Sequence, residues 1–256
     1  MSGTLISSGV KTMRCRLADL VALPDPISQG TRHLPVRHDE LVATMKVKLE
    51  RAGYQVVREE YALGYHGARL FGVLDLIPDG PLTALVTSEQ GLTLGFRSGN
   101  DRSMSIHLVA GARVTVCDNM VLSGDMIVLR RKHTTHLNLA EEVAAGVDEL
   151  TAHYRVLEAG INRLKAACIT DQEAKEKIYD AFLTDHVLAT KYLPAVNRNY
   201  FEPEEEWTDC RPRTLWGVHN AFTRTVKLLE SPATQLAVTN RLGQVFNLRK
   251  DVVEVG

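Results

Sequence analysis

The pattern of apolar and polar residues changes to a period of about two at Tyr54-Gln-Val-Val-Arg-Glu-Glu-Tyr61, which is followed by Gly64-Tyr-His-Gly67 and by a second apolar segment at 68–77. A period of two is typical of strands, and two such segments joined by a glycine-bearing turn predict an antiparallel hairpin. Turn residues punctuate the chain after this hairpin and predict short strands at 83–88, 92–97, 104–109, 113–117 and 126–129. We therefore expect one curved antiparallel sheet of short strands.

Helices are predicted before and after this sheet. Asp39 is a typical helix-start residue, and Gly53 fits the left-handed position that ends a helix. Downstream, a heptad repeat predicts one long helix near 139–168. Its apolar stripe packs either on the sheet of the same chain or on another subunit, and the second alternative predicts a homo-oligomer. The stripe consists of Val143, Val147, Leu150, Tyr154, Leu157, Ile161, Leu164 and Cys168.

The C-terminal third is predicted to be helical. Thr170-Asp-Gln-Glu173 is a capping box that opens a helix to about Leu183, and two more helices are expected at 214–229 and 234–248. The fold class is therefore α+β, with an N-terminal helix, a curved antiparallel sheet, a long heptad-patterned helix and further C-terminal helices. We divide the chain into an irregular N-terminal arm (1–37) with a short strand near 13–20, an α+β core (38–168), and a helical part (169–256) packed on the core.

Composition excludes several classes of protein. The formal net charge of −1 does not fit a strongly basic nucleic-acid binder, so such a role would need a local basic patch. No apolar run is long enough to span a bilayer and no signal peptide is visible, so we expect a cytoplasmic protein without membrane contact. We expect no metal and no cofactor, because the cysteines are scattered without close pairs. They are Cys15, Cys117, Cys168 and Cys210.

A basic patch is expected at one end of the sheet. The glycine-bearing loop Gly95-Phe-Arg-Ser-Gly-Asn-Asp-Arg102 and the run Arg130-Arg-Lys-His133 can present guanidinium, ammonium and backbone N–H groups to phosphates. The alternative is a solvated turn and strand end. Residues 97–136 carry net charge +3 and residues 139–185 carry −5, so the charges are segregated. The candidate nucleic-acid-binding residues are Arg97, Asn100, Arg102, Arg130, Arg131, Lys132 and His133, with Phe96 as a base-stacking ring.

Catalytic motifs are weak in this chain. His133-Thr-Thr-His136, together with Asp118 and Asp125, leaves a metal-assisted enzyme open as an alternative. P-loop, dinucleotide-binding, GxSxG and HExxH motifs are absent, so the sequence leans away from an enzyme. Later in the chain, helical spacing places Trp216, Asn220 and Thr223 on one face, for a structural role or for contact with a base or ligand.

Five segments of the chain carry a family resemblance. They are 68–74, Leu94-Gly-Phe-Arg-Ser-Gly-Asn-Asp101, Gly111-Ala-Arg-Val-Thr-Val-Cys-Asp-Asn119, Arg131-Lys-His-Thr134 and Trp216-Gly-Val-His-Asn-Ala-Phe-Thr223. On these segments the sequence resembles the phage/plasmid-like proteins grouped as domain of unknown function 932, over about residues 38–225. Ser98-Gly99 departs from that family, which usually has Asn-Ser in this loop. The resemblance implies a gene of phages, plasmids or integrated elements and implies no activity.

The first functional hypothesis is binding or annealing of single-stranded DNA in recombination or replication. The order of a helix, antiparallel hairpins and a long helix is similar to the core of ring-forming single-strand annealing proteins of phages. In this interpretation the basic end of the sheet holds the DNA. The alternatives are a metal-assisted enzyme acting on nucleic acid or a phosphorylated metabolite, and an anti-defence protein whose acidic helices bind a host factor.

Overall fold

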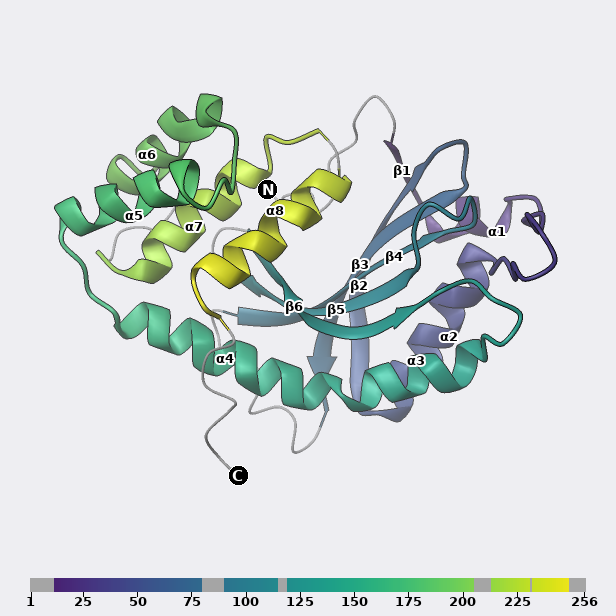
Figure 1. Ribbon diagram of the computed structural model, residues 1–256. Helices are drawn as coiled ribbons and strands as arrows, with labels where there is room; N and C mark the ends of the chain where they lie inside the picture. Colours follow the sequence, from purple (N-terminus) through teal and green to yellow (C-terminus); the bar gives the residue numbers. More distant parts are fainter. Residues whose placement is uncertain (1–11, 80–89, 115–118, 205–212, 231, 249–256) are drawn as a thin grey trace.

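A six-stranded antiparallel sheet forms the centre of the protein (Figure 1). The computed structural model describes residues 12–79, 90–114, 119–204, 213–230 and 232–248. Strands that are consecutive in the chain are neighbours in the sheet, and every pair is antiparallel. The predicted α+β class is therefore confirmed. The strands are β1 (Thr12–Cys15), β2 (Tyr54–Gly64), β3 (Arg69–Pro78), β4 (Gln90–Gly99), β5 (Ile106–Val114) and β6 (Asn119–Arg131).

Helices cover both faces of this sheet. In Figure 1, α2, α3 and α4 lie along one face and α8 crosses the other, while α5, α6 and α7 gather at the end far from α1. Among the described residues, no helix combines the length and apolar character that crossing a membrane requires. The helices are α1 (Leu17–Val21), α2 (His38–Arg51), α3 (Leu139–Asp148), α4 (Leu150–Ala166), α5 (Asp171–Leu183), the 3-10 turn η2 (Thr190–Tyr192), α6 (Leu193–Phe201), α7 (Leu215–Val226) and α8 (Pro232–Val245).

The strands are longer than the sequence predicted. Strand β5 continues through Gly111, and β6 continues through residues 123–125, which were expected to form a turn. Gly111 pairs with Thr93 on one side and Leu122 on the other, so hydrogen bonding to two neighbours outweighs its local turn preference. The segment expected at 13–20 is strand only to Cys15 and then turns into α1. The strand expected at 83–88 and residues 115–117 lie outside the described part of the chain.

The predicted long helix near 139–168 is two helices, so the expectation of one continuous heptad-patterned helix is wrong. Helix α3 ends at Asp148 and α4 begins at Leu150, with Glu149 between them. The apolar stripe is nevertheless buried from Val143 to Leu164, within the core of its own chain. Cys168, the last expected member, is exposed. The stripe therefore packs within the chain, which was the first of the two alternatives.

Local helix signals correspond closely to the structure. Gly53, with φ +82°, follows α2 in the left-handed conformation that glycine adopts without strain. In the capping box of α5, the Glu173 amide donates to Thr170 Oγ1 over 3.2 Å, and the Thr170 amide donates to Glu173 Oε2 over 2.7 Å. Each of these predictions is confirmed because it depends on residues within one helical turn.

The core face of the sheet contains a row of three paired residues. Tyr61, Gly72 and Phe96 are register partners on β2, β3 and β4. The rings of Tyr61 and Phe96 meet edge to face across Gly72, with centroids 6.2 Å apart. A Cβ atom on Gly72 would lie 2.1 Å from Phe96 Cζ, so only glycine leaves room for the ring. Phe96 is 5% exposed. The expectation that its ring stacks on a base is therefore wrong.

Helix α7 is the buried centre of the helical part. Every residue from Trp216 to Val226 is buried, including Asn220 and Thr223, so the face predicted for a structural role or base contact does not reach solvent. His219 stacks on Trp216 at a centroid distance of 5.1 Å and contacts Phe246 edge to face at 5.2 Å. Burial lowers the pKa of His219 to about 3.

Replacement of His219 by phenylalanine is expected to flatten the dependence of stability on pH. The pKa of His219 is lowered from its ordinary value of 6.5, so the unfolded chain takes up a proton at a higher pH than the folded chain. Wild-type stability should therefore fall as the pH drops below about 6.5, by about 1.4 kcal/mol per pH unit from this residue. Urea unfolding of both proteins between about pH 7 and about pH 5 measures the difference.

The control for this experiment is the same substitution at exposed His136. The free energy of unfolding of His219→Phe, minus that of wild type, should increase steadily as the pH falls. The stability of His136→Phe should depend on pH as that of wild type does. A His219→Phe difference that stays constant over this range would contradict the burial of a neutral imidazole in this aromatic contact.

Candidate functional site

Three neighbouring strands present one row of polar side chains at the end of the sheet. Arg97 on β4 pairs with His107 on β5, and His107 pairs with Arg130 on β6. Directly paired residues project from the same face, roughly 5 Å apart. The Arg97 Nη2 group donates a hydrogen bond to His107 Nδ1 over 3.2 Å. Strand register thus assembles a compact cationic row from residues far apart in the chain.

This row lies in an open cleft of about 760 Å³, which we call the basic cleft. Its walls come from the end of the sheet, the β4–β5 loop, the segment after β6, and residues 29–33 of the N-terminal arm. No aspartate or glutamate is among the described residues that line it. The cationic and imidazole side chains of the lining are Arg32, Arg97, Arg102, Arg130, Lys132, His33, His107 and His133.

The electrostatics of the cleft favour an anion. Burial and the neighbouring charge of Arg130 lower the pKa of Arg97, and the buried Arg97 Nε has no hydrogen-bond partner among the described residues. Burial, then Arg97 and Arg130, lower the pKa of His107 to about 4, so the imidazole is neutral at pH 7. Guanidinium groups that repel one another without a carboxylate between them are stabilised when an anion binds.

Two further histidines line the cleft. The rings of His33 and His133 lie with centroids 6.1 Å apart, and His133 Nε2 is 3.1 Å from Ser98 Oγ. Burial and the neighbouring histidines His33 and His38 lower the pKa of His133 to about 4. His133 is therefore neutral at pH 7 and can exchange hydrogen bonds with a ligand without adding charge.

Residues 29–36, which we call the strap, are held against the sheet by long-range hydrogen bonds. The Leu34 amide donates to the His133 carbonyl over 3.3 Å, and Arg102 Nη1 donates to the Gln29 carbonyl over 3.2 Å. Asn100 bonds both backbone groups of Val36, accepting from its amide over 3.0 Å and donating to its carbonyl over 2.8 Å. The strap therefore forms a fixed wall of the cleft.

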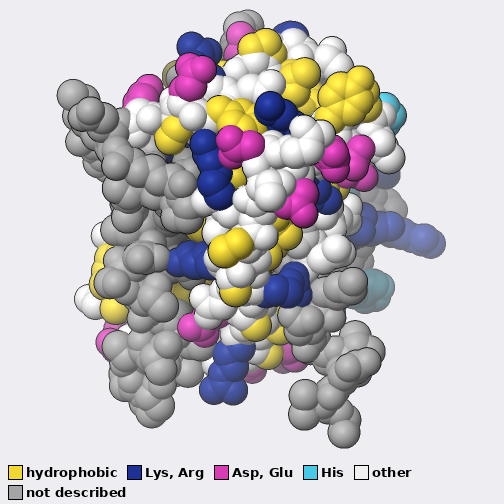
Figure 2. Space-filling model, turned by 90° about the vertical axis from the view of Figure 1, so that its left-hand side faces the viewer, with side chains coloured by type: hydrophobic (Ala, Val, Ile, Leu, Met, Phe, Trp, Pro, Cys, Tyr) yellow, Lys and Arg dark blue, Asp and Glu magenta, His cyan; other side chains and the backbone are white. Residues whose placement is uncertain are grey.

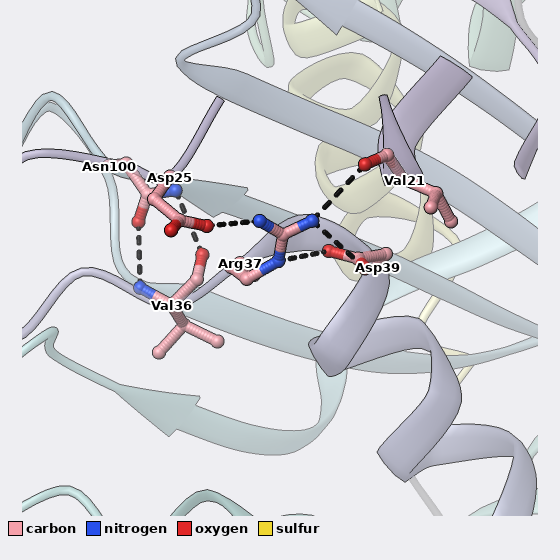
Figure 3. A network of polar contacts seen from close by, with 6 residues as sticks. All are labelled: Val21, Asp25, Val36, Arg37, Asp39 and Asn100. Atoms are coloured by element: carbon pink, nitrogen blue, oxygen red, sulfur yellow. Dashed lines mark hydrogen bonds and ion pairs between the residues drawn. The ribbon is translucent and has the colours of Figure 1, made fainter. Parts of the chain in front are cut away.

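Figure 3 shows how the end of the strap is anchored. The Arg37 guanidinium donates to the carboxylates of Asp25 and Asp39 and to the Val21 carbonyl, while Asn100 bonds Val36 beside it. The ion pairs of Arg37 fix the start of α2 relative to the arm. Arg37 is thus neutralised by two acids, in contrast to the arginines of the cleft.

The structure brings together five of the seven candidate residues. Arg97, Arg102, Arg130, Lys132 and His133 all line the cleft. The remaining two do not. Asn100 is 7% exposed, and its side chain is hydrogen-bonded to the backbone of the strap at Val36. Arg131 points to the other side of β6, because side chains alternate along a strand, and its Nε donates to Glu142 Oε2 on α3 over 2.6 Å.

Sequence reasoning missed Arg32, His33 and His107 as members of this site. Arg32 and His33 belong to the irregular arm, about 65 residues before Arg97 in the chain, and no local pattern links the two segments. The pairing of His107 with Arg97 depends on the register of β4 and β5. A small signal existed in the arm, whose net charge from Lys11 to Arg37 is +3.

Two of the four residues proposed for a metal-assisted enzyme, His133 and His136, are described with their side chains. His133 is buried whereas His136 is exposed. Asp118 lies outside the described residues, and the side chain of Asp125 is likewise not described. Within the part of the chain that the structure describes, no cluster of three or more histidine, cysteine, aspartate or glutamate side chains is arranged to hold a metal ion.

The helical end of the molecule has a different surface. Figure 2 shows the face on the side of α5 and α6, where basic and acidic side chains are interspersed with apolar ones. A surface of mixed charge does not concentrate one sign of potential as the basic cleft does. The cleft is therefore the stronger candidate for binding a charged ligand.

Comparison with known proteins gives one match. The family model described as "Domain of unknown function (DUF932)" matches residues 30–234, which is most of the chain. The chain belongs to the DUF932 family. No curated protein and no solved structure matches it. Apart from Gln29, every residue that lines the basic cleft falls inside the matched DUF932 segment.

Proposed function

We propose that this DUF932 protein binds single-stranded DNA through the basic cleft. The observation that carries the proposal is a cleft with five cationic side chains and no described carboxylate, in which Arg97 is half-buried and its Nε has no hydrogen-bond partner among the described residues. Placing like charges together is unfavourable without a counter-charge. Phosphates supply that counter-charge, and arginine binds them with two parallel hydrogen bonds.

A flexible strand fits this cleft better than a duplex. Arg97 and His107 line the cleft from β4 and β5, and residues 29–33 of the strap line it from the arm. A stiff duplex presents its phosphates on a convex surface, whereas a single strand can bend so that its backbone follows a groove. An open cleft also lets a polymer enter and leave at its ends, which an enclosed pocket does not.

The cellular context of the proposal rests on the resemblance to phage- and plasmid-associated proteins. DNA in a single-stranded state is an intermediate of recombination and replication, so a protein that holds it serves either process on a mobile element. Annealing of two strands would require a second binding surface or a second copy of the chain. The proposal for the cleft is limited to binding.

Salt dependence of binding tests the proposal. Five phosphate contacts to a single strand predict a slope of about −3.5 for the logarithm of affinity against the logarithm of salt concentration. Affinity for a labelled oligothymidylate should therefore fall about 100-fold between about 50 and about 200 mM salt. Fluorescence anisotropy measures both values.

Competitors define what the cleft recognises. A single-stranded oligonucleotide should displace the label, and pyrophosphate should do so only at far higher concentration, because one small anion replaces only part of the contacts. If pyrophosphate competes as well as the oligonucleotide, the cleft binds a small phosphorylated molecule. No binding at the lowest salt concentration would reject the proposed function.

A further inference from the structure

The hairpin that joins β2 to β3 carries an exposed aromatic ring. Tyr65 is 58% exposed at the tip of this hairpin. Among the tyrosine, phenylalanine and tryptophan side chains that the structure describes, Tyr65 and Tyr179 are exposed, and the second lies on α5. In Figure 1 the tip of the β2–β3 hairpin lies at the end of the sheet near α1, and α5 lies at the opposite end of the molecule.

The ring of Tyr65 is connected through Arg69 to the β4–β5 loop. The guanidinium of Arg69 lies 4.1 Å from the ring centroid, and Arg69 Nε donates to Asp101 Oδ2 over 2.6 Å. The next residue, Arg102, lines the basic cleft. The hairpin and the β4–β5 loop are also joined directly, because the Asn100 amide donates to the Ala68 carbonyl over 2.9 Å.

The backbone under this ring adopts a conformation that tyrosine disfavours. Tyr65 and His66 have φ of +53° and +55°, and Gly67 follows with φ +87°. Asparagine and glycine are the residues that tolerate left-handed positions in hairpin turns, whereas a bulky side chain is strained there. Arg102, on the neighbouring loop, is left-handed as well, with φ +61°. Strained positions of this kind cluster at binding sites.

We propose that Tyr65 stacks on a base of the DNA strand whose phosphates occupy the basic cleft. The inference rests on the proposed function and extends it from phosphate binding to base contact. One face of the ring lies on Arg69, which leaves the other face open for a base. Aromatic rings stack on every base without regard to sequence, so the contact adds affinity and no sequence preference. Tyr65 thereby takes the role that buried Phe96 does not fill.

The test compares an oligothymidylate of about 20 nucleotides with an abasic oligomer of the same length, in wild type and in Tyr65→Asn. Wild type should bind the oligothymidylate more tightly than the abasic oligomer. In Tyr65→Asn, affinity for the oligothymidylate should fall about tenfold, and affinity for the abasic oligomer should not change. The urea midpoint of the variant should be no lower than that of wild type, because asparagine tolerates the left-handed turn.

Tyr179→Asn is the matched control, since Tyr179 is also 58% exposed but lies on α5. This variant should bind both oligomers as wild type does, and Tyr65→Trp should retain tight binding of the oligothymidylate. Unchanged binding of the oligothymidylate by Tyr65→Asn, or equal loss for both oligomers, would overturn the role of Tyr65 and leave the cleft proposal intact. If wild type binds neither oligomer, both proposals are rejected.

Discussion

Replacement of Arg97 and Arg130 together by glutamate is expected to weaken single-stranded DNA binding on the order of 100-fold at about 50 mM salt. The two guanidinium groups flank His107 in one row across three strands, and all three side chains line the basic cleft. Loss of two phosphate contacts should also reduce the salt slope by about 1.4. Anisotropy with a labelled oligothymidylate, repeated at several salt concentrations, measures both effects.

The matched control is the double change Arg131→Glu and Arg198→Glu, which gives the same net charge. Arg131 on β6 donates to Glu142 on α3, and Arg198 is exposed on α6. This control should retain nearly wild-type affinity, because neither side chain lines the cleft. Arg97→Gln provides a milder variant if the charge reversal lowers stability. Equal loss of affinity in the two double variants would show that net charge, and not the cleft, controls binding.

Replacement of Gly72 by valine is expected to destabilise the protein by about 3 kcal/mol. A Cβ at this position would lie 2.1 Å from Phe96 Cζ and 2.6 Å from Phe96 Cε1. The Phe96 ring packs against Tyr61 in a dense core and cannot move aside without losing that contact. The free energy of unfolding, measured with urea, should fall by this amount.

Gly91→Val on β4 is the control, because a Cβ at Gly91 meets none of the described atoms within 4 Å. Valine is favoured in strands, so this change should be neutral or slightly stabilising. In the Gly72→Val background, Phe96→Ala should lower the free energy of unfolding much less than it does in wild type. The reason is that the valine side chain fills the space of the missing ring. Strictly additive losses in the double variant would contradict the close approach of residue 72 and the ring.

Strand β4 shows why core and site depend on each other. Phe96 and Arg97 are adjacent, so they project from opposite faces of the sheet. Phe96 fixes the strand in the core while Arg97 reaches the cleft. A register shift of one residue would exchange the two side chains. We therefore expect Gly72→Val to reduce DNA binding only in proportion to the fraction of protein that is unfolded.

The sequence by itself determined the features that depend on neighbours along the chain. The end of α2 just before Gly53, the capping box at Thr170 and the helix that begins after Thr214 all follow from contacts within one or two turns. The α+β class follows from the change of period between segments. Five of the seven candidate site residues could also be found locally, because they gather in two short basic segments.

Tertiary structure alone decided the rest, because long-range hydrogen bonds and packing override local preference. Pairing with two neighbouring strands keeps Gly111 within β5. Side chains alternate along paired strands, so Phe96 points into the core and Arg131 points to Glu142. The charge pattern of the sequence does not distinguish Arg131 from Arg97 and Arg130. The strap completes the cleft through bonds between residues about 65 to 100 positions apart, and separations of that size leave no periodic signal in a sequence.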